Sequence, residues 1–119
     1  MAGMQKHAGG CHCGAVRYEV TVDASQPLEC NCSHCARLGL LLAFTTPDNF
    51  KLLSGQDAQT EYRFNKHVIQ HLFCTTCGTQ SYAHGKTPDG KPMVAINVRC
   101  LEGVDPASLQ ITQVDGKSR

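Results

Sequence analysis

The middle of the chain carries Cys74-Thr75-Thr76-Cys77, a pair of cysteines separated by two residues. This spacing places two thiolates about 4 Å apart on one side of a turn, which suits a tetrahedral zinc ion with Zn–S bonds of about 2.3 Å. Two other clusters are as tightly spaced, Cys11-His12-Cys13 and Cys30-Asn31-Cys32-Ser33-His34-Cys35. Seven of the eight cysteines lie in these clusters, so the sequence predicts zinc coordination.

One zinc ion cannot bind seven thiolates, and the cysteines must therefore divide between two sites. The first and third clusters together give a closed structural site with four ligands: Cys11, Cys13, Cys74 and Cys77. The middle cluster gives an open site with three protein ligands, where water or substrate can bind: Cys30, Cys32 and Cys35. This division rests on counting, because Cys11 and Cys13 could instead join part of the middle cluster.

The cysteines allow two other interpretations. A short chain with eight cysteines could carry a disulfide framework. The first ten residues lack the apolar segment of a secretory signal, and cysteines one residue apart are poorly placed for bridges, so we do not expect disulfides. A thioredoxin-like redox pair at Cys74 and Cys77 would need a following helix, whereas residues 78–82 have the pattern of a turn and a strand.

Length and charge limit the possible classes of protein. The 119 residues suffice for one domain, and we expect a single zinc-binding domain over residues 1–119. A formal net charge of +1 provides no basic surface for phosphate backbones, so nucleic acid is not an expected partner. The longest apolar run, residues 40–44, is far too short for a membrane span. Reduced, metal-binding cysteines predict a cytoplasmic protein.

Alternating apolar and polar residues predict a mainly β fold with short helical turns. Valine and tyrosine alternate with polar residues over 16–22, as in a half-buried strand. Further strands are predicted over residues 40–45, 50–53, 60–64, 68–73, 81–84, 93–99 and 110–114. A hairpin turn is expected around Asn65-Lys66, and residues 85–92 have the composition of an exposed loop. Short helical turns are predicted over 34–38, between Ser33 and Gly39, and over 104–109.

The chemistry expected of the open site follows from its charge. Three thiolates leave the zinc site with a formal negative charge, whereas three neutral imidazoles would leave the positive charge that activates water at neutral pH. The sulfur-rich site is the weaker Lewis acid and favours a soft fourth ligand, such as a thiol. The residues therefore predict attack of a thiol on an electrophilic carbon rather than hydrolysis.

Four motifs follow one another along the chain: Gly10-Cys11-His12-Cys13-Gly14-Ala15-Val16, Cys30-Asn31-Cys32-Ser33-His34-Cys35, Phe73-Cys74-Thr75-Thr76-Cys77-Gly78 and Asn97-Val98-Arg99-Cys100-Leu101. Together, over roughly residues 9–109, they resemble the glutathione-dependent formaldehyde-activating enzyme family, which also includes centromere protein V. The resemblance implies several coiled antiparallel β-sheets around a zinc-ribbon-like core. It also implies two zinc ions per chain, one structural and one catalytic, with the division of ligands given above.

The activity implied by the resemblance is the condensation of glutathione with formaldehyde to S-hydroxymethylglutathione, a reversible carbon–sulfur lyase reaction. In this interpretation Cys30, Cys32 and Cys35 are the catalytic residues, and their zinc takes the sulfur of glutathione as its fourth ligand. Two other classes of function stay open. The chain could be a carrier that binds glutathione or another small thiol without turnover, or an interaction module stabilised by zinc.

The chain departs from the family directly after the third cluster. Family members usually follow the last cysteine with a basic residue, whereas Ala36 stands here and the charge falls on Arg37. Arg37 or Arg99 could still bind a substrate carboxylate, although a solvated surface arginine is the more common case. Cys100, the eighth cysteine, is expected to be a small buried residue rather than a reactive thiol.

The histidines are weaker candidates for metal ligands. His12 and His34 lie inside cysteine clusters, where we expect their rings to point away from the metal. His67 and His71 are four residues apart, a spacing that faces a single metal only on a helix, and this segment is predicted to be a strand. His84 stays open as a residue that could approach the open site from another strand.

Overall fold

Two β-sheets packed against each other organise this chain. The computed structural model describes residues 4–31, 33–63, 69–87, 89–105 and 108–115. The strands within these residues are β1 (Gln5–Gly10), β2 (Arg17–Val22), β3 (Leu28–Cys30), β4 (Leu42–Thr45), β5 (Phe50–Ser54), β6 (Gln59–Tyr62), β7 (Gln70–Cys74), β8 (Gln80–Lys86), β9 (Pro92–Asn97) and β10 (Thr112–Val114). The α-helix among them is α1 (Ser33–Leu38), and the 3-10 turns are η1 (Pro47–Asn49), η2 (Gln56–Ala58) and η3 (Val98–Cys100).

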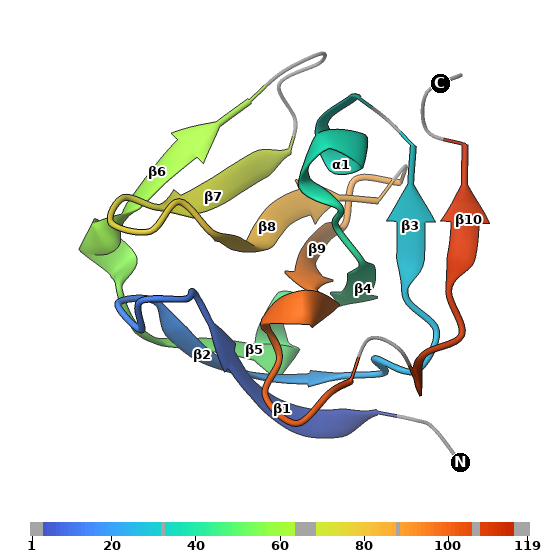
Figure 1. Cartoon of the computed structure of the whole chain (residues 1–119), viewed down its shortest axis with the longest axis horizontal. Helices are drawn as coiled ribbons and strands as arrows, with labels where there is room; N and C mark the ends of the chain where they lie inside the picture. The colour runs from blue at the N-terminus through green and yellow to red at the C-terminus, as the bar shows by residue number, and fades with distance from the viewer. Residues whose placement is uncertain (1–3, 32, 64–68, 88, 106–107, 116–119) are drawn as a thin grey trace.

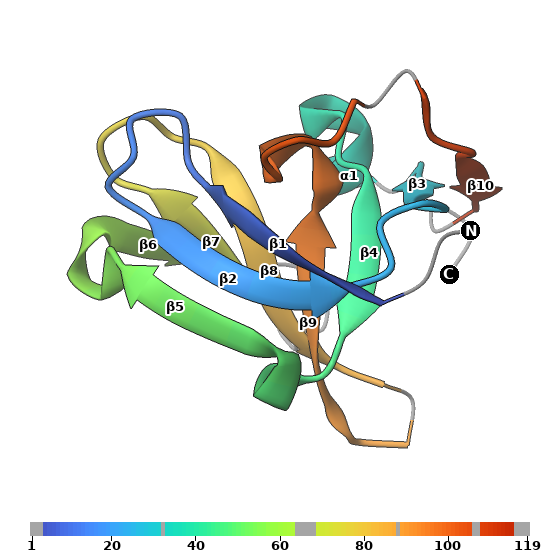
Figure 2. The ribbon, with the colours of Figure 1, turned by 90° about the horizontal axis from the view of Figure 1, so that it is seen from below.

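The smaller sheet has the strand order β1-β2-β5, and the larger sheet has the order β10-β3-β4-β9-β8-β7-β6. Figure 1 shows the larger sheet as an arc above the smaller one, with α1 on the side of the arc away from β1, β2 and β5. Figure 2 shows the smaller sheet crossing in front of β7, β8 and β9. The prediction of a mainly β protein with only short helical segments is confirmed for the described residues.

Several predicted boundaries differ from the observed ones. β1 was not predicted, because its residues are polar or small and carry no apolar alternation. The strand predicted over 93–99 ends at Asn97, where the Asn97 side chain caps the η3 turn by accepting from the Arg99 backbone N–H. The predicted loop over 85–92 is shorter, because β8 continues to Lys86 and β9 begins at Pro92.

Other predictions concern the segments around α1, the hairpin turn and the chain end. The turn predicted between Ser33 and Gly39 is α1, and Gly39 ends it with a φ of 65°. The turn expected around Asn65-Lys66 lies outside the described residues, as do residues 106–107 of the turn expected over 104–109. The described strand pairs are antiparallel except one, since β10 runs parallel to β3.

The hydrophobic core lies between the two sheets. Burial alternates along β2 as the sequence predicts, with Tyr18, Val20 and Val22 all buried. The Tyr18 hydroxyl crosses the interface and donates to the carbonyl of Ser81 at 3.1 Å. A Cβ at Gly9 would lie 2.8 Å from the Tyr18 ring, so only glycine allows β1 to pass over this tyrosine.

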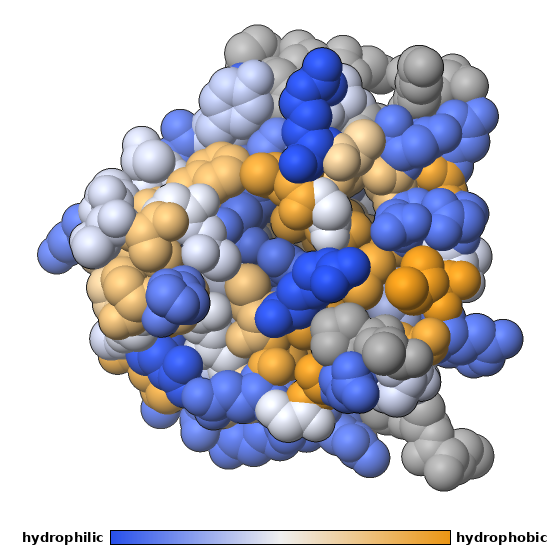
Figure 3. All heavy atoms as spheres, viewed as in Figure 1, coloured by the Kyte–Doolittle hydropathy of each residue, from blue (hydrophilic) through white to orange (hydrophobic). Residues whose placement is uncertain are grey.

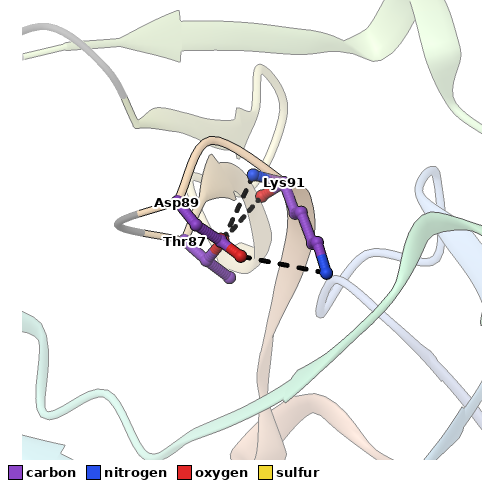
Figure 4. A network of polar contacts seen from close by, with 3 residues as sticks. All are labelled: Thr87, Asp89 and Lys91. Carbon is purple, nitrogen blue, oxygen red and sulfur yellow. Dashed lines mark hydrogen bonds and ion pairs between the residues drawn. The ribbon is translucent and has the colours of Figure 1, made fainter.

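The turn between β8 and β9 is held by the polar network of Figure 4. Thr87 and Lys91 close the hairpin through the Thr87 N–H, which donates to the Lys91 carbonyl at 2.8 Å. The Thr87 hydroxyl donates to the Asp89 carboxylate and accepts from the Lys91 backbone N–H at 3.2 Å. The Lys91 ammonium lies 3.8 Å from the same carboxylate. These contacts fix the register of the two central strands, β8 and β9.

Within the described residues, the structure contains no helix with the length and apolarity that a bilayer crossing requires.

Replacing Tyr18 with Phe should weaken the contact between the sheets. The change keeps the ring but leaves the buried Ser81 carbonyl without its donor, and we expect the free energy of unfolding to fall by about 1–3 kcal/mol in urea denaturation. Tyr62→Phe, at a half-exposed ring, is the matched control and should change it by less than about 0.5 kcal/mol. Equal losses in the two variants would contradict this role for Tyr18.

Candidate metal centre

Two hairpin turns from different sheets bring four cysteines together. The turn between β1 and β2 carries Cys11 and Cys13, and the turn between β7 and β8 carries Cys74 and Cys77. Their four sulfur atoms all lie within 4.8 Å of one another. Cys13 and Cys74, whose sulfurs are in contact, lie 61 positions apart in the sequence. The structure thus assembles the four residues that counting assigns to the closed site.

The spacing of these sulfurs fits a zinc ion. Cys13 Sγ lies 3.6 Å from Cys11 Sγ and 3.6 Å from Cys74 Sγ. A tetrahedron with Zn–S bonds of about 2.3 Å has sulfur–sulfur edges of about 3.8 Å. Four thiolates are also the donor set that a structural zinc prefers over hard cations such as calcium or magnesium. Distance and chemistry therefore both agree with a zinc held by four cysteines.

The two turns present their sulfurs in the same way. Backbone N–H groups point at the first cysteine of each pair, since Val16 N–H donates to Cys11 Sγ at 3.3 Å and Thr76 N–H donates to Cys74 Sγ at 3.4 Å. A glycine with positive φ then reverses each chain, at Gly14 (85°) and Gly78 (79°). N–H groups aimed at sulfur stabilise the thiolate, which is the form that binds a metal.

The acidities of these thiols show why a cation belongs among them. The Thr79 hydroxyl, followed by the backbone N–H groups of Cys13 and Thr79, lowers the pKa of Cys77 to about 5. Although the Ala15 N–H favours its thiolate, the sulfurs of Cys74 and Cys11 raise the pKa of Cys13 to about 11. The Cys13 thiol thus shares its proton with neighbouring sulfurs, and a bound divalent ion would replace that proton.

The residues of the predicted open site are described only in part. Cys30 is half-buried at the end of β3, Cys35 is buried in α1, and Cys32 lies outside the described residues. Cys30 and Cys35 line the same cavity, which has a volume of about 260 Å³ and also includes His71 and Gln80 in its wall. Two members of the trio thus meet at a hollow large enough for a small ligand.

Gln80 joins two histidines beside this cavity. His34 Nε2 lies 2.8 Å from Gln80 Oε1, and Gln80 Nε2 lies 3.1 Å from His71 Nδ1. The amide oxygen can only accept and the amide nitrogen can only donate, so His34 carries its proton on Nε2 and a neutral His71 carries its proton on Nε2. The two rings are 4.1 Å apart between centroids. Burial, with the neighbouring His34, lowers the pKa of His71 to about 4, and its ring is neutral at pH 7.

The sequence does not predict the hydrogen bonds of Gln80 with His34 and His71. Gln80 has no motif around it, and it contacts both histidines only because β8 places it between α1 and β7. The Asn97 side-chain amide donates to the Gln80 carbonyl at 3.0 Å and holds its backbone. The spacing of His67 and His71 would suit a shared metal only on a helix. His67 lies outside the described residues. The strand predicted for His71 is present as β7.

The remaining candidates lie away from the cavity or are bound elsewhere. His12 is exposed, and His84 does not approach the cavity, because its ring contacts Phe50 and Tyr82. Arg37 donates to the Ser33 carbonyl at 2.9 Å, and Arg99 donates to the Gly39 carbonyl at 3.0 Å. Neither arginine lines the cavity. Both guanidinium groups instead support the two ends of α1.

Cys100 behaves as a structural thiol. It is half-buried, with its Sγ 3.9 Å from the Gln80 carbonyl oxygen. Burial, with the charges of Cys11 and Cys77, raises the pKa of Cys100 to about 11. Such a thiol stays protonated at neutral pH and is a poor nucleophile. Among the seven described cysteines, none forms a disulfide.

Comparisons with known proteins show two similarities. A family model described as "Glutathione-dependent formaldehyde-activating enzyme" matches residues 6–113, which include all three cysteine clusters. A crystal structure of a Rhodobacter sphaeroides protein is similar to this structure with a TM-score of 0.77 and 31% sequence identity. The similarity covers 88% of this chain and 99% of that chain.

Loss of one ligand of the four-cysteine site should remove the metal and the fold together. We expect Cys74→Ser to lose bound zinc and more than about 4 kcal/mol of the free energy of unfolding, because the site closes a long loop between two sheets. Cys100→Ser is the matched control, and it should keep the metal and lose less than about 1 kcal/mol. Metal content by mass spectrometry and urea denaturation measure both effects, and a Cys74→Ser protein as stable as the control would contradict the prediction.

Proposed function

Because this chain belongs to the glutathione-dependent formaldehyde-activating enzyme family, we propose that it condenses a small thiol, such as glutathione, with formaldehyde. The product is S-hydroxymethylglutathione, and the reverse reaction makes the chain a carbon–sulfur lyase. The observation that carries the proposal is the cavity where Cys30 and Cys35, from separate elements, meet His71 and Gln80. The reduced cysteines further support a cytoplasmic location.

In this proposal Cys30, Cys32 and Cys35 hold a second zinc ion, additional to the one at Cys11, Cys13, Cys74 and Cys77. When bound by three thiolates, the ion supplies a soft Lewis acid that lowers the pKa of a thiol while leaving its sulfur nucleophilic. The hydrogen bond from the Asn31 backbone N–H to the Val114 carbonyl, at 3.1 Å, anchors the end of β3 next to Cys30. Cys35 is fixed by the packing of α1 on the larger sheet.

The histidine network takes part in the proton transfer that accompanies addition of the thiol. Addition of a thiol to an aldehyde turns the carbonyl oxygen into a hydroxyl, so a donor beside that oxygen assists the reaction. Gln80 holds a neutral His71 in the tautomer with its proton on Nε2, and His71 lies in the cavity wall. A neutral imidazole is suited to donate to a carbonyl oxygen at pH 7. The surrounding apolar wall keeps bulk water from competing for this contact.

Cys30→Ser should abolish turnover without unfolding the protein. The substitution removes one sulfur of the open trio and leaves the four-cysteine site intact, so we expect metal content to fall from two zinc ions per chain to one. The rate of thiol–aldehyde exchange, measured by NMR exchange spectroscopy, should fall to that of the uncatalysed reaction. Cys100→Ser is the control and should retain both metal and rate. A Cys30→Ser protein with unchanged rate would rule out catalysis at this site.

Calorimetric titration with glutathione separates the proposed enzyme from an interaction module. We expect the zinc-loaded protein to release heat on binding glutathione, because the open site has a position for a thiol. The Cys30→Ser protein should show no such heat. Absence of heat from both proteins at millimolar glutathione would exclude an enzyme and a thiol carrier alike. Heat of binding without catalysed exchange would identify a carrier.

A further inference from the structure

The larger sheet uses both of its faces. Along β9, Val94 and Ile96 point into the core between the sheets, whereas Met93 and Ala95 alternate with them and line the cavity. Along β4, Ala43 belongs to the core and Phe44 to the cavity. The cavity therefore lies on the face opposite the smaller sheet, under α1. Figure 3, viewed from the same side as Figure 1, shows hydrophobic and hydrophilic residues interspersed over this face of the molecule.

The cavity wall combines a few polar side chains with many apolar ones. Its polar side chains are Cys30, Cys35, His71 and Gln80. Seven large apolar side chains make most of its remaining wall: Leu28, Leu40, Leu42, Phe44, Ile69, Met93 and Val114. Phe44 and Ile69 are 40% and 43% exposed, which is high for large apolar residues. None of the described residues in the wall is an acid, a lysine or an arginine.

This lining does not suit the reactants named so far. Glutathione carries carboxylates and an ammonium group at neutral pH, and burial of these charges without partners costs several kcal/mol each. Its peptide part therefore belongs outside the cavity, with only its sulfur beside Cys30 and Cys35. Formaldehyde is a single CH₂O unit. A molecule the size of water occupies roughly 30 Å³, so the cavity volume of about 260 Å³ is several times larger than formaldehyde needs.

We infer that the aldehyde substrate of this protein carries a hydrocarbon chain of several carbons, which lies against the apolar wall with its carbonyl beside Cys30 and Cys35. The inference rests on the proposed function and extends its aldehyde substrates from formaldehyde to longer, apolar aldehydes. The thiol sulfur bonds to the aldehyde carbon, the C=O π bond breaks, and the thiol proton ends on the oxygen. The atoms balance without an oxidant, a reductant or a leaving group.

A series of aldehydes with glutathione as the fixed thiol tests the inference. We expect kcat/KM, corrected for the uncatalysed addition, to rise about three- to fourfold for each methylene from acetaldehyde to hexanal, as expected for burial of CH₂ groups. NMR exchange spectroscopy measures the rates. Turnover of formaldehyde with equal or lower kcat/KM for the longer aldehydes would overturn the inference and leave the proposed function standing.

Variants of the wall test where the chain lies. Ala95→Leu adds volume inside the cavity, and we expect it to lower the ratio of hexanal to formaldehyde kcat/KM at least about tenfold. Ala8→Leu, on β1 of the other sheet and outside the wall, is the matched control and should keep the ratio. Ile69→Ala removes a half-exposed part of the wall without filling it, and should lower the same ratio if Ala95→Leu does not fold. An unchanged ratio in a folded wall variant would overturn the inference.

A binding measurement makes the inference independent of turnover. Hexanol has the chain but no reactive carbonyl, and we expect it to shift the NMR signals of the Leu42, Ile69 and Met93 methyl groups in the zinc-loaded protein, whereas methanol does not. Absence of turnover with every aldehyde would refute the proposed function. The hexanol titration would then show by itself whether the cavity binds a hydrocarbon chain. Shifts at these methyl groups would support such binding, and their absence would overturn it.

Discussion

The structure depends on the meeting of four sulfur atoms between two hairpin turns. Cys11 and Cys13 come from the smaller sheet and Cys74 and Cys77 from the larger one, so a metal bound there joins the two layers of the core. Closing so long a segment by contacts alone costs chain entropy, which metal binding offsets in one step. Packing of Tyr18 against Tyr82 and the hydroxyl contact to Ser81 then continue the same junction through the core.

The two faces of the larger sheet have different tasks, and the pleat of its strands separates them. Residues of one parity complete the core, while residues of the other parity form the wall of the cavity beneath α1. The short helix α1, which carries Cys35, lies over that wall, and Arg99 ties its C-terminal end to the η3 turn by donating to the Gly39 carbonyl. The core and the cavity thereby lie on opposite sides of one layer.

Much of the fold and part of the site could be predicted from local sequence. Alternation over residues 16–22 and the glycine after each cysteine pair depend on neighbours a few positions away. β1 could not be predicted, because its pairing with β2 and not its own composition makes it a strand. The contact of Gln80 with His34 and His71 joins three separate elements, as does the apolar cavity. Such features arise from the register of strands in the assembled sheet, which no local pattern contains.

The parallel pairing of β10 with β3 has a consequence for the chain end. Val114 lies opposite Cys30 in this ladder and also forms part of the cavity wall. Fraying of the last strand would open the wall beside that cysteine, and an occupied cavity would oppose the fraying. Hydrogen exchange at the amides of residues 112–114 therefore reports whether the cavity is filled. These protons exchange slowly with solvent when a ligand fills the cavity and quickly when it is empty.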